Sequence, residues 1–164
     1  MAPHRVVITG IGVVSALGHD RSAFWAGLTG GRSGIRRIES VDPDLLSFDY
    51  GAEIPDYDVN VLFDTREDRH LDRFAQYALL AGREAVADSG VEWTDALRRQ
   101  GAVVTGSCFG GQHTQDAQFE LFYRQGKQRF HPHNIPKIMA NAGASRLSME
   151  FGLQGPAFTL TTAC

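Results

Sequence analysis

Apolar and polar residues follow two patterns along this chain, one typical of β-strands and the other typical of α-helices. Short runs that are apolar on both faces are typical of strands in a sheet covered on both sides. These runs occupy residues 6–8, 102–104 and 157–161. Apolar residues three and four positions apart predict helices, here over residues 20–29, 72–89, 114–124 and 136–151. Strands that alternate with helices in this order predict an α/β layered fold.

The ends of these helices carry capping residues. Asp20 is a favourable N-cap for the first helix, and Gly30 ends it. Gly90 follows the second helix, at a position where the chain often turns left-handed. Between these two helices, residues 32–64 are rich in Asp, Pro, Gly and Ser, which predicts irregular structure with one short strand over 52–54.

The helix over 72–89 has mostly small residues on one face. Small side chains let neighbouring backbones approach closely, so we expect this helix to be packed deep between layers. The residues of this face are Phe74, Ala75, Ala78, Ala81, Gly82 and Ala85.

Composition narrows the class of protein without identifying it. The chain has 164 residues, enough for one compact domain, and no repeat or linker divides it. A net charge of −3 gives no electrostatic reason to expect nucleic acid as a partner. No apolar run approaches the ~18 residues of a membrane span, and the N-terminus is too strand-like for a signal peptide. Two cysteines, Cys108 and Cys164, do not make a disulfide framework, so a reducing cytoplasm is the expected location.

Two glycine-rich segments follow apolar strands. Residues 9–15, TGIGVVS, resemble a degenerate dinucleotide fingerprint, which would indicate a nucleotide-binding oxidoreductase. The expected helix starts only near Asp20, well beyond Gly12, and the third glycine is missing, so a turn that merely packs is favoured. Residues 106–111, GSCFGG, fit equally a simple exit loop or a loop that approaches a ligand, with Phe109 projecting into a pocket.

A basic segment, RQGKQRFHPHNIPK, spans residues 124–137 and contains no acidic residue. Such a run is commonly a solvated face, and the alternative is a docking patch for an acidic partner. His131 and His133 have no Cys, Asp or Glu nearby to complete a metal site, so no metal is expected.

Cys164 follows the apolar strand over 157–161. A lone cysteine at a strand end is commonly a small buried apolar residue. A helix that started at this point would instead lower the thiol pKa, because its dipole and free amides stabilise a thiolate. The spacing alone leaves both roles open.

In their order along the chain, these segments resemble the β-ketoacyl-acyl carrier protein synthases, most of all the elongating type-II condensing enzymes of fatty acid synthesis. The likeness extends over essentially all 164 residues. It is carried by RVVITGIGVVSALG at 5–18, FWAGLTGGRSGI at 24–35, LDRFAQYALLAGREAVADSG at 71–90, VVTGSCFGG at 103–111 and NAGASRLSMEFGLQGPAFTLTTAC at 141–164.

The resemblance implies a thiolase-like fold, a layered αβαβα sandwich of two similar halves, and an acyltransferase without a cofactor. Cys164 would take an acyl group from an acyl carrier protein thioester, and its backbone amide would be one oxyanion-hole donor. The carbanion left when malonyl-acyl carrier protein loses CO₂ would then attack the acyl-enzyme, extending a fatty acid or a polyketide/polyene chain.

The same resemblance makes residues 1–164 the N-terminal half, with the C-terminal half absent, and a fragment is the favoured interpretation. Two catalytic histidines, a lysine and the second oxyanion donor would lie in the other half. Residues 1–164 by themselves are therefore expected to be inactive.

The resemblance also assigns binding residues. Those at the entrance for the acidic carrier protein are Arg66, Arg69, Lys127 and Arg129. Those of the acyl pocket are Phe109, Asn134, Ile135 and Ala163. Phe109 stands where a smaller aliphatic residue is usual, and residues 132–136 replace two aromatics at a dimer contact that borders the partner's acyl pocket. A bulky Phe109 and a polar Asn134 disfavour a plain long saturated chain.

Two assemblies follow from the resemblance, a homodimer and a ketosynthase-type heterodimer. The alternative function is that of a non-catalytic, chain-length-determining partner subunit. Such partners generally lack a cysteine at this point, so Cys164 favours the enzyme.

Overall fold

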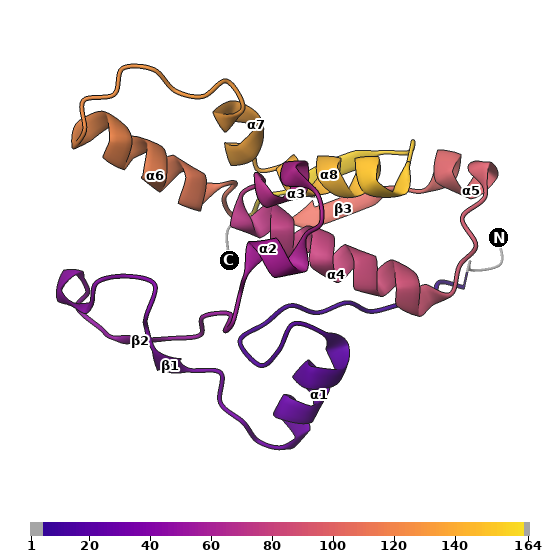
Figure 1. The fold of residues 1–164 in the computed structure, drawn as a ribbon. Helices are drawn as coiled ribbons and strands as arrows, with labels where there is room; N and C mark the ends of the chain where they lie inside the picture. The colour runs from indigo at the N-terminus through magenta and orange to yellow at the C-terminus, as the bar shows by residue number, and fades with distance from the viewer. Residues whose placement is uncertain (1–4, 163–164) are drawn as a thin grey trace. The chain divides into compact units, whose positions relative to one another are not determined.

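The structure, a computed structural model, describes residues 5–162 apart from the side chains of Pro43 and Glu67. Its helices are α1 (Arg21–Thr29), α2 (Val59–Leu62), α3 (Arg66–Arg69), α4 (Arg73–Ser89), α5 (Asp95–Gln100), α6 (Gln112–Tyr123), α7 (Asn134–Ile138) and α8 (Ala142–Phe151), with a 3₁₀ turn η1 at Pro43–Leu45 (Figure 1). Its strands are β1 (Arg36–Arg37), β2 (Tyr50–Gly51), β3 (Val103–Gly106) and β4 (Ala157–Leu160). Helices and strands mixed along the chain confirm the α/β class.

The chain separates into two compact units. The first consists of Met1–Leu62 with Leu80–Val91, and the second of Phe63–Leu79 with Glu92–Cys164, so α4 contributes to both. No helix within residues 5–162 has the length and apolar character needed to cross a membrane.

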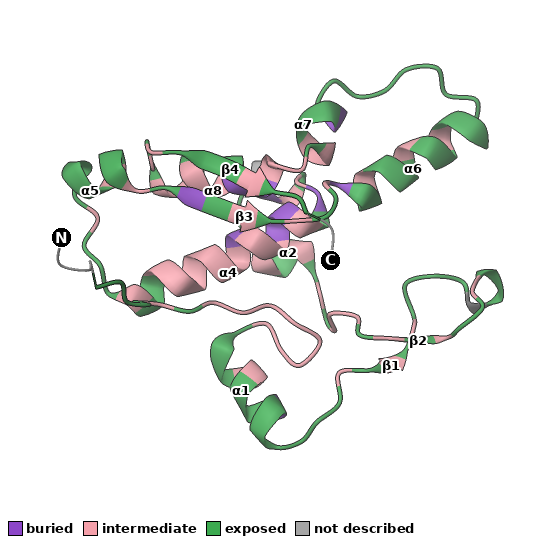
Figure 2. Cartoon of the chain, turned by 180° about the vertical axis from the view of Figure 1, so that it is seen from behind, coloured by how far each residue is buried: buried purple, intermediate pink, exposed green. Residues whose placement is uncertain are grey.

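The sheet of the second unit pairs β3 with β4 in parallel. α8 packs on one face of this sheet, where Val103 and Ala144 are buried, and Figure 2 shows buried positions on β3, α8 and the first turns of α4. On the other face Val104, Phe158 and Leu160 are exposed. The two strands are confirmed, but the expectation of burial on both faces is wrong for the described residues, because α8 covers only one side.

A buried carboxylate ties α8 to the segment that precedes α4. Asp68 is 1% exposed and accepts hydrogen bonds from Arg146 Nε at 3.1 Å and Nη2 at 2.5 Å. Gln76, also buried, donates through Nε2 to the backbone carbonyls of Asp68 at 3.0 Å and Arg69 at 3.2 Å. These contacts satisfy polar groups that would otherwise destabilise the core of this unit.

In the first unit, the strand expected over 6–8 is wrong, because this segment pairs with no strand in the part of the chain that the structure describes. The backbone that follows it bonds to side chains of α4. Ile11 N–H donates to Asp88 Oδ2 at 3.0 Å and Val13 N–H to Glu84 Oε2 at 2.8 Å. The Ile11 bond is the main cause that lowers the pKa of Asp88 below its ordinary value. Helix carboxylates here accept the hydrogen bonds that a neighbouring strand would accept in a sheet.

The glycines of the 9–15 segment allow close packing on α4. A Cβ atom added to Gly10 would lie 2.1 Å from the carbonyl oxygen of Ala85, and one added to Gly12 would lie 1.9 Å from that of Ala81. Neither position has room for a side chain. The glycine pattern is therefore explained by packing, which favours the structural interpretation over the dinucleotide fingerprint.

The helix caps agree with their sequence signals. Asp20 Oδ1 accepts from Ala23 N–H at 2.8 Å at the start of α1, and Gly30 follows its end. Gly90 and Gly152 follow α4 and α8 with φ of +60° and +63°, the left-handed region that glycine adopts without strain.

The single helix expected over 136–151 is instead two helices. α7 ends before Met139, which is extended with φ −63° and ψ 135°, and α8 starts three residues later. In the break, the Ala140 carbonyl accepts a hydrogen bond from Thr159 Oγ1 of β4 at 3.3 Å. This bond between segments distant in sequence stabilises a break that helical periodicity does not reveal.

Two short elements also differ from expectation. The strand expected over 52–54 is wrong, because the paired strand β2 ends at Gly51, and Glu53 beyond it accepts through its side chain from the N–H groups of Glu39 and Ser40. The sequence pattern does not predict α5, which spans six residues and is capped by Thr94, because so short a helix shows little periodicity.

Replacing Arg146 by Met should lower the free energy of unfolding by about 3 kcal/mol, because the buried Asp68 loses its guanidinium partner. The matched change Arg37→Met removes an ion pair with Asp49 whose arginine side chain is 73% exposed, and should cost less than about 1 kcal/mol. Urea unfolding of the full-length protein measures both. Equal losses for the two variants would contradict the prediction.

Candidate functional site

The carboxyl ends of β3 and β4 leave the sheet side by side. Their parallel register sets Gly106 opposite Leu160, and just beyond it Ser107 N–H donates to the Leu160 carbonyl at 3.1 Å. The glycine loop after β3 therefore starts next to the segment after β4. Cys164 and Ala163, two of the predicted site residues, belong to that segment but lie outside the described residues.

A pair of threonines fixes this edge of the sheet. Thr105 Oγ1 and Thr159 Oγ1 are 2.7 Å apart across the two strands. Because Thr159 donates its hydroxyl hydrogen to the Ala140 carbonyl, Thr105 is the donor between the two hydroxyls. The chain of bonds joins β3, β4 and the α7–α8 connection.

The glycine loop packs against the end of α7. Gly111 N–H donates to the Ile138 carbonyl at 3.1 Å, and a Cβ atom added to Gly110 would lie 1.9 Å from that same oxygen. Phe109 is 65% exposed, and the Ser107 hydroxyl donates to its carbonyl. In the described residues, the close approach of this loop is to the protein's own backbone, and Cys108 is exposed on it.

Asp72 holds the helix that follows this loop. Its side chain is buried, and it accepts from Phe74 N–H through Oδ1 at 3.3 Å and from Thr114 N–H through Oδ2 at 2.7 Å. One carboxylate therefore caps the first turns of both α4 and α6. The sequence identifies Asp72 as the start of a helix, but its contact with Thr114, 42 positions away, carries no sequence signal.

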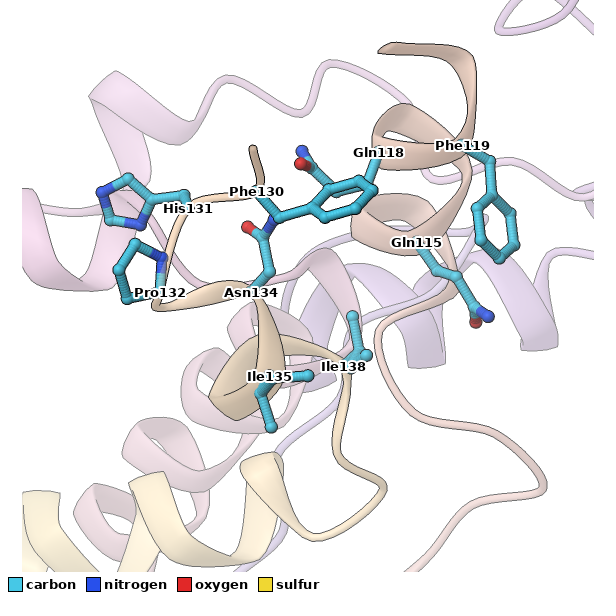
Figure 3. A pocket seen from close by; sticks show the side chains of 9 residues that line it. All are labelled: Gln115, Gln118, Phe119, Phe130, His131, Pro132, Asn134, Ile135 and Ile138. Carbon is cyan, nitrogen blue, oxygen red and sulfur yellow. The ribbon is translucent and has the colours of Figure 1, made fainter. Parts of the chain in front are cut away.

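A pocket of about 340 Å³ lies between α6, α7 and the segment that joins them (Figure 3). Two residues predicted for the acyl pocket, Asn134 and Ile135, line it, whereas Phe109 does not. The other lining residues are Gln115, Gln118, Phe119, Phe130, His131, Pro132 and Ile138. The sequence analysis does not assign these seven to a pocket, because residues 130–132 belong to an irregular segment and only the fold brings that segment together with α6 and α7.

The four basic residues predicted for partner docking lie on two segments of the second unit. Arg66 and Arg69 belong to α3, and Lys127 and Arg129 to the segment between α6 and α7. Arg66, Lys127 and Arg129 are exposed, and Arg69 is partly exposed. Their charges are thus accessible to solvent, as docking would require.

Comparison with known proteins gives a consistent result. Residues 4–164 match the family model described as "Beta-ketoacyl synthase, N-terminal domain". The 3-oxoacyl-[acyl-carrier-protein] synthase 2 of Coxiella burnetii and that of Vibrio harveyi are each 33% identical over 164 residues, which is 100% of this chain and 40% of the relative. The chain thus spans about 40% of the length of these curated relatives.

Solved structures agree. The ishigamide ketosynthase/chain length factor superposes with a TM-score of 0.84 at 30% identity, over 96% of this chain and 40% of that one. A beta-ketoacyl synthase from Burkholderia phymatum superposes with a TM-score of 0.73 at 26% identity, over 97% and 39% respectively.

Replacing Gly110 by Ala should loosen the glycine loop, because the added methyl group would collide with the Ile138 carbonyl. We expect faster hydrogen exchange at residues 106–114 and a loss of about 1–3 kcal/mol in stability. Gly106→Ala is the matched control, since an added Cβ meets nothing within 4 Å there. Hydrogen-exchange mass spectrometry of the full-length variants measures both, and unchanged exchange in Gly110→Ala would refute the role of this contact.

Proposed function

Because the chain belongs to the β-ketoacyl synthase family and has the thiolase-like fold of its structural neighbours, we propose that the whole protein is a condensing acyltransferase. Its reaction is the decarboxylative Claisen condensation of an acyl group held on Cys164 with malonyl-acyl carrier protein. The observation that carries this proposal is the parallel pairing of β3 with β4, which sets the glycine loop beside the segment that leads to Cys164.

The first half of the reaction is acyl transfer. The Cys164 thiolate attacks the carbonyl carbon of an acyl-carrier thioester and forms a new carbon–sulfur bond. The bond from that carbon to the carrier's sulfur breaks, and the carrier leaves as a thiolate that takes a proton from water. Exchange of one thioester for another costs little free energy, so the reaction needs a reactive thiolate and stabilisation of the oxyanion.

The second half forms the new carbon–carbon bond. The malonyl group on its carrier loses CO₂, and the electron pair of the broken bond stays on the α-carbon. That carbanion attacks the acyl-enzyme carbonyl, which gives a 3-oxoacyl-carrier product and returns Cys164 as a thiolate. The product class agrees with the names of the curated relatives, which are 3-oxoacyl-[acyl-carrier-protein] synthases.

A second candidate function is that of a non-catalytic, chain-length-determining subunit. The observation that favours it is the likeness to a structure described as a ketosynthase/chain length factor. Cys164 argues for the catalytic role, since it gives the chain the nucleophile that transfer requires. Either role fits a homodimer or a heterodimer of ketosynthase-type chains.

The acyl carrier protein is the partner that this function requires. Carrier proteins are acidic, and the exposed charges of Arg66, Lys127 and Arg129, with Arg69, offer the complementary sign. Such charges act mainly on the rate of encounter and are screened by salt.

The nucleophile assignment predicts that an acyl-thioester modifies Cys164 and leaves Cys108 unmodified in the full-length protein. Peptide mass mapping after incubation with octanoyl-pantetheine measures the adduct, and Cys164→Ala should abolish it. Cys108→Ala is the matched control and should acylate as the wild type does. An adduct on Cys108 alone would rule out the assignment.

The docking proposal predicts that reversing two of the basic residues, Lys127→Glu with Arg129→Glu, raises the KM for the carrier protein. Exposed charge pairs contribute about 0.2–1 kcal/mol each, so the two together allow a rise of up to roughly thirtyfold at low ionic strength and a smaller one at high salt. Arg99→Glu, at an exposed residue of α5, is the control for a charge reversal elsewhere on the surface and should leave the KM near the wild-type value. A fall in kcat at constant KM would contradict a docking role.

A further inference from the structure

Helix α6 has no cap from its own stretch of sequence. Its N-cap residue is Gly111, which has no side chain to accept a hydrogen bond, and its first turn contains no acidic residue. The first N–H groups of a helix need acceptors, because no earlier turn supplies them. Asp72, 42 positions before Thr114, supplies one, since its Oδ2 accepts from Thr114 N–H at 2.7 Å. A negative charge at this end of α6 also interacts favourably with the helix dipole.

The same carboxylate oxygen contacts the glycine loop directly. A Cβ atom added to Gly111 would lie 2.9 Å from Asp72 Oδ2 and closer still to the Lys137 carbonyl oxygen, so this position has no room for a side chain. Asp72 is 3% exposed, so water does not compete for the contact. The last residue of the glycine loop is therefore fixed between the carboxylate and α7.

The other end of the glycine loop is joined to the segment before Cys164. The loop starts at Ser107, whose N–H donates to the Leu160 carbonyl at 3.1 Å, and Leu160 is the last residue of β4. One short loop is thus held at Gly111 by Asp72 and at Ser107 by the strand that leads to Cys164. Release of the first end would loosen the second.

Resting on the proposed function, we propose that Asp72 is a positioning residue for acyl transfer to Cys164. One of its oxygens caps α4 through Phe74 N–H, and the other holds the start of α6 and the end of the glycine loop. Asp72 acts through the loop, by keeping the backbone beside the nucleophile's segment in one place. Acyl transfer is sensitive to such placement, because the reacting atoms must meet at about 3–3.5 Å and an error of about 1 Å can cost about a hundredfold in rate.

The variant Asp72→Ser separates the two roles of this side chain. Serine is about as good an N-cap as aspartate, so the first turn of α4 keeps its cap. Its single, shorter side-chain oxygen leaves Thr114 N–H without that acceptor. Asp72→Asn keeps the shape of the side chain but has one oxygen for two N–H groups and no charge, so its effect should fall between those of the wild type and Asp72→Ser.

Two rates are measured at Cys164 of the full-length protein by peptide mass mapping, acylation by octanoyl-pantetheine and alkylation by iodoacetamide. Alkylation needs only an accessible thiolate, whereas acylation also needs the carbonyl carbon held in place and its oxyanion stabilised. In Asp72→Ser we expect acylation to fall about tenfold relative to alkylation. Hydrogen exchange over residues 106–115 should become faster in the same variant.

Arg146→Met is the matched control for a loss of stability alone. It removes the partner of another buried carboxylate of the same unit, Asp68, and leaves the Asp72 contacts intact. While this variant stays folded, the ratio of acylation to alkylation should remain that of the wild type.

A wild-type ratio in folded Asp72→Ser or Asp72→Asn would overturn the proposal, and so would an equal fall in Arg146→Met. Loss of the fold in both Asp72 variants would show that this residue serves stability alone and would overturn it too. Failure of the wild type to become acylated, while iodoacetamide still modifies Cys164, would instead count against the condensing function. In that case the exchange of residues 106–115 would still test the role of Asp72 in holding the loop.

Discussion

Parallel pairing of β3 with β4 brings together two segments separated by about fifty residues of sequence. Parallel strands run in one direction, so the segments after them leave at the same edge of the sheet. Here the glycine loop comes after one strand, and the approach to Cys164 comes after the other. The Thr105–Thr159 hydroxyl pair reinforces this register at the edge where the two segments depart.

The elements around that edge are held by a few buried polar contacts. Asp72 caps the first turns of α4 and α6, and Asp68 accepts two hydrogen bonds from the guanidinium of Arg146 on α8. Each carboxylate joins segments that apolar packing alone would leave free to slide. Such bonds are directional, so they favour one arrangement over other compact ones. The glycine loop and α7 can then meet at van der Waals distance through Gly110.

The buried polar side chains of the second unit differ in whether they have a hydrogen-bond partner among the described residues. The buried side chains of Asp68, Asp72 and Gln76 have partners within the protein, and they serve the fold. Asn134 is buried as well, but its amide nitrogen has no hydrogen-bond partner among the described residues. The open face of the β3–β4 sheet is apolar, and Phe158 is exposed on it. Apolar contacts on this face are not directional, in contrast to the hydrogen bonds of the buried carboxylates.

Local sequence determined the helix caps, the long helix over 72–89, the two strands of the parallel sheet and, by resemblance, the family. These features depend on neighbouring residues and on periodicity, which a sequence displays directly. Only the tertiary structure decided that residues 6–8 bond to no strand, that the helix over 136–151 breaks at Met139, and that Phe109 lies outside the α6–α7 pocket. The last two depend on partners far away in the chain: the Thr159 hydroxyl for the break at Met139, and the returning segment with Phe130 for the pocket. Sequence shows which groups can bond, and the fold determines which of them meet.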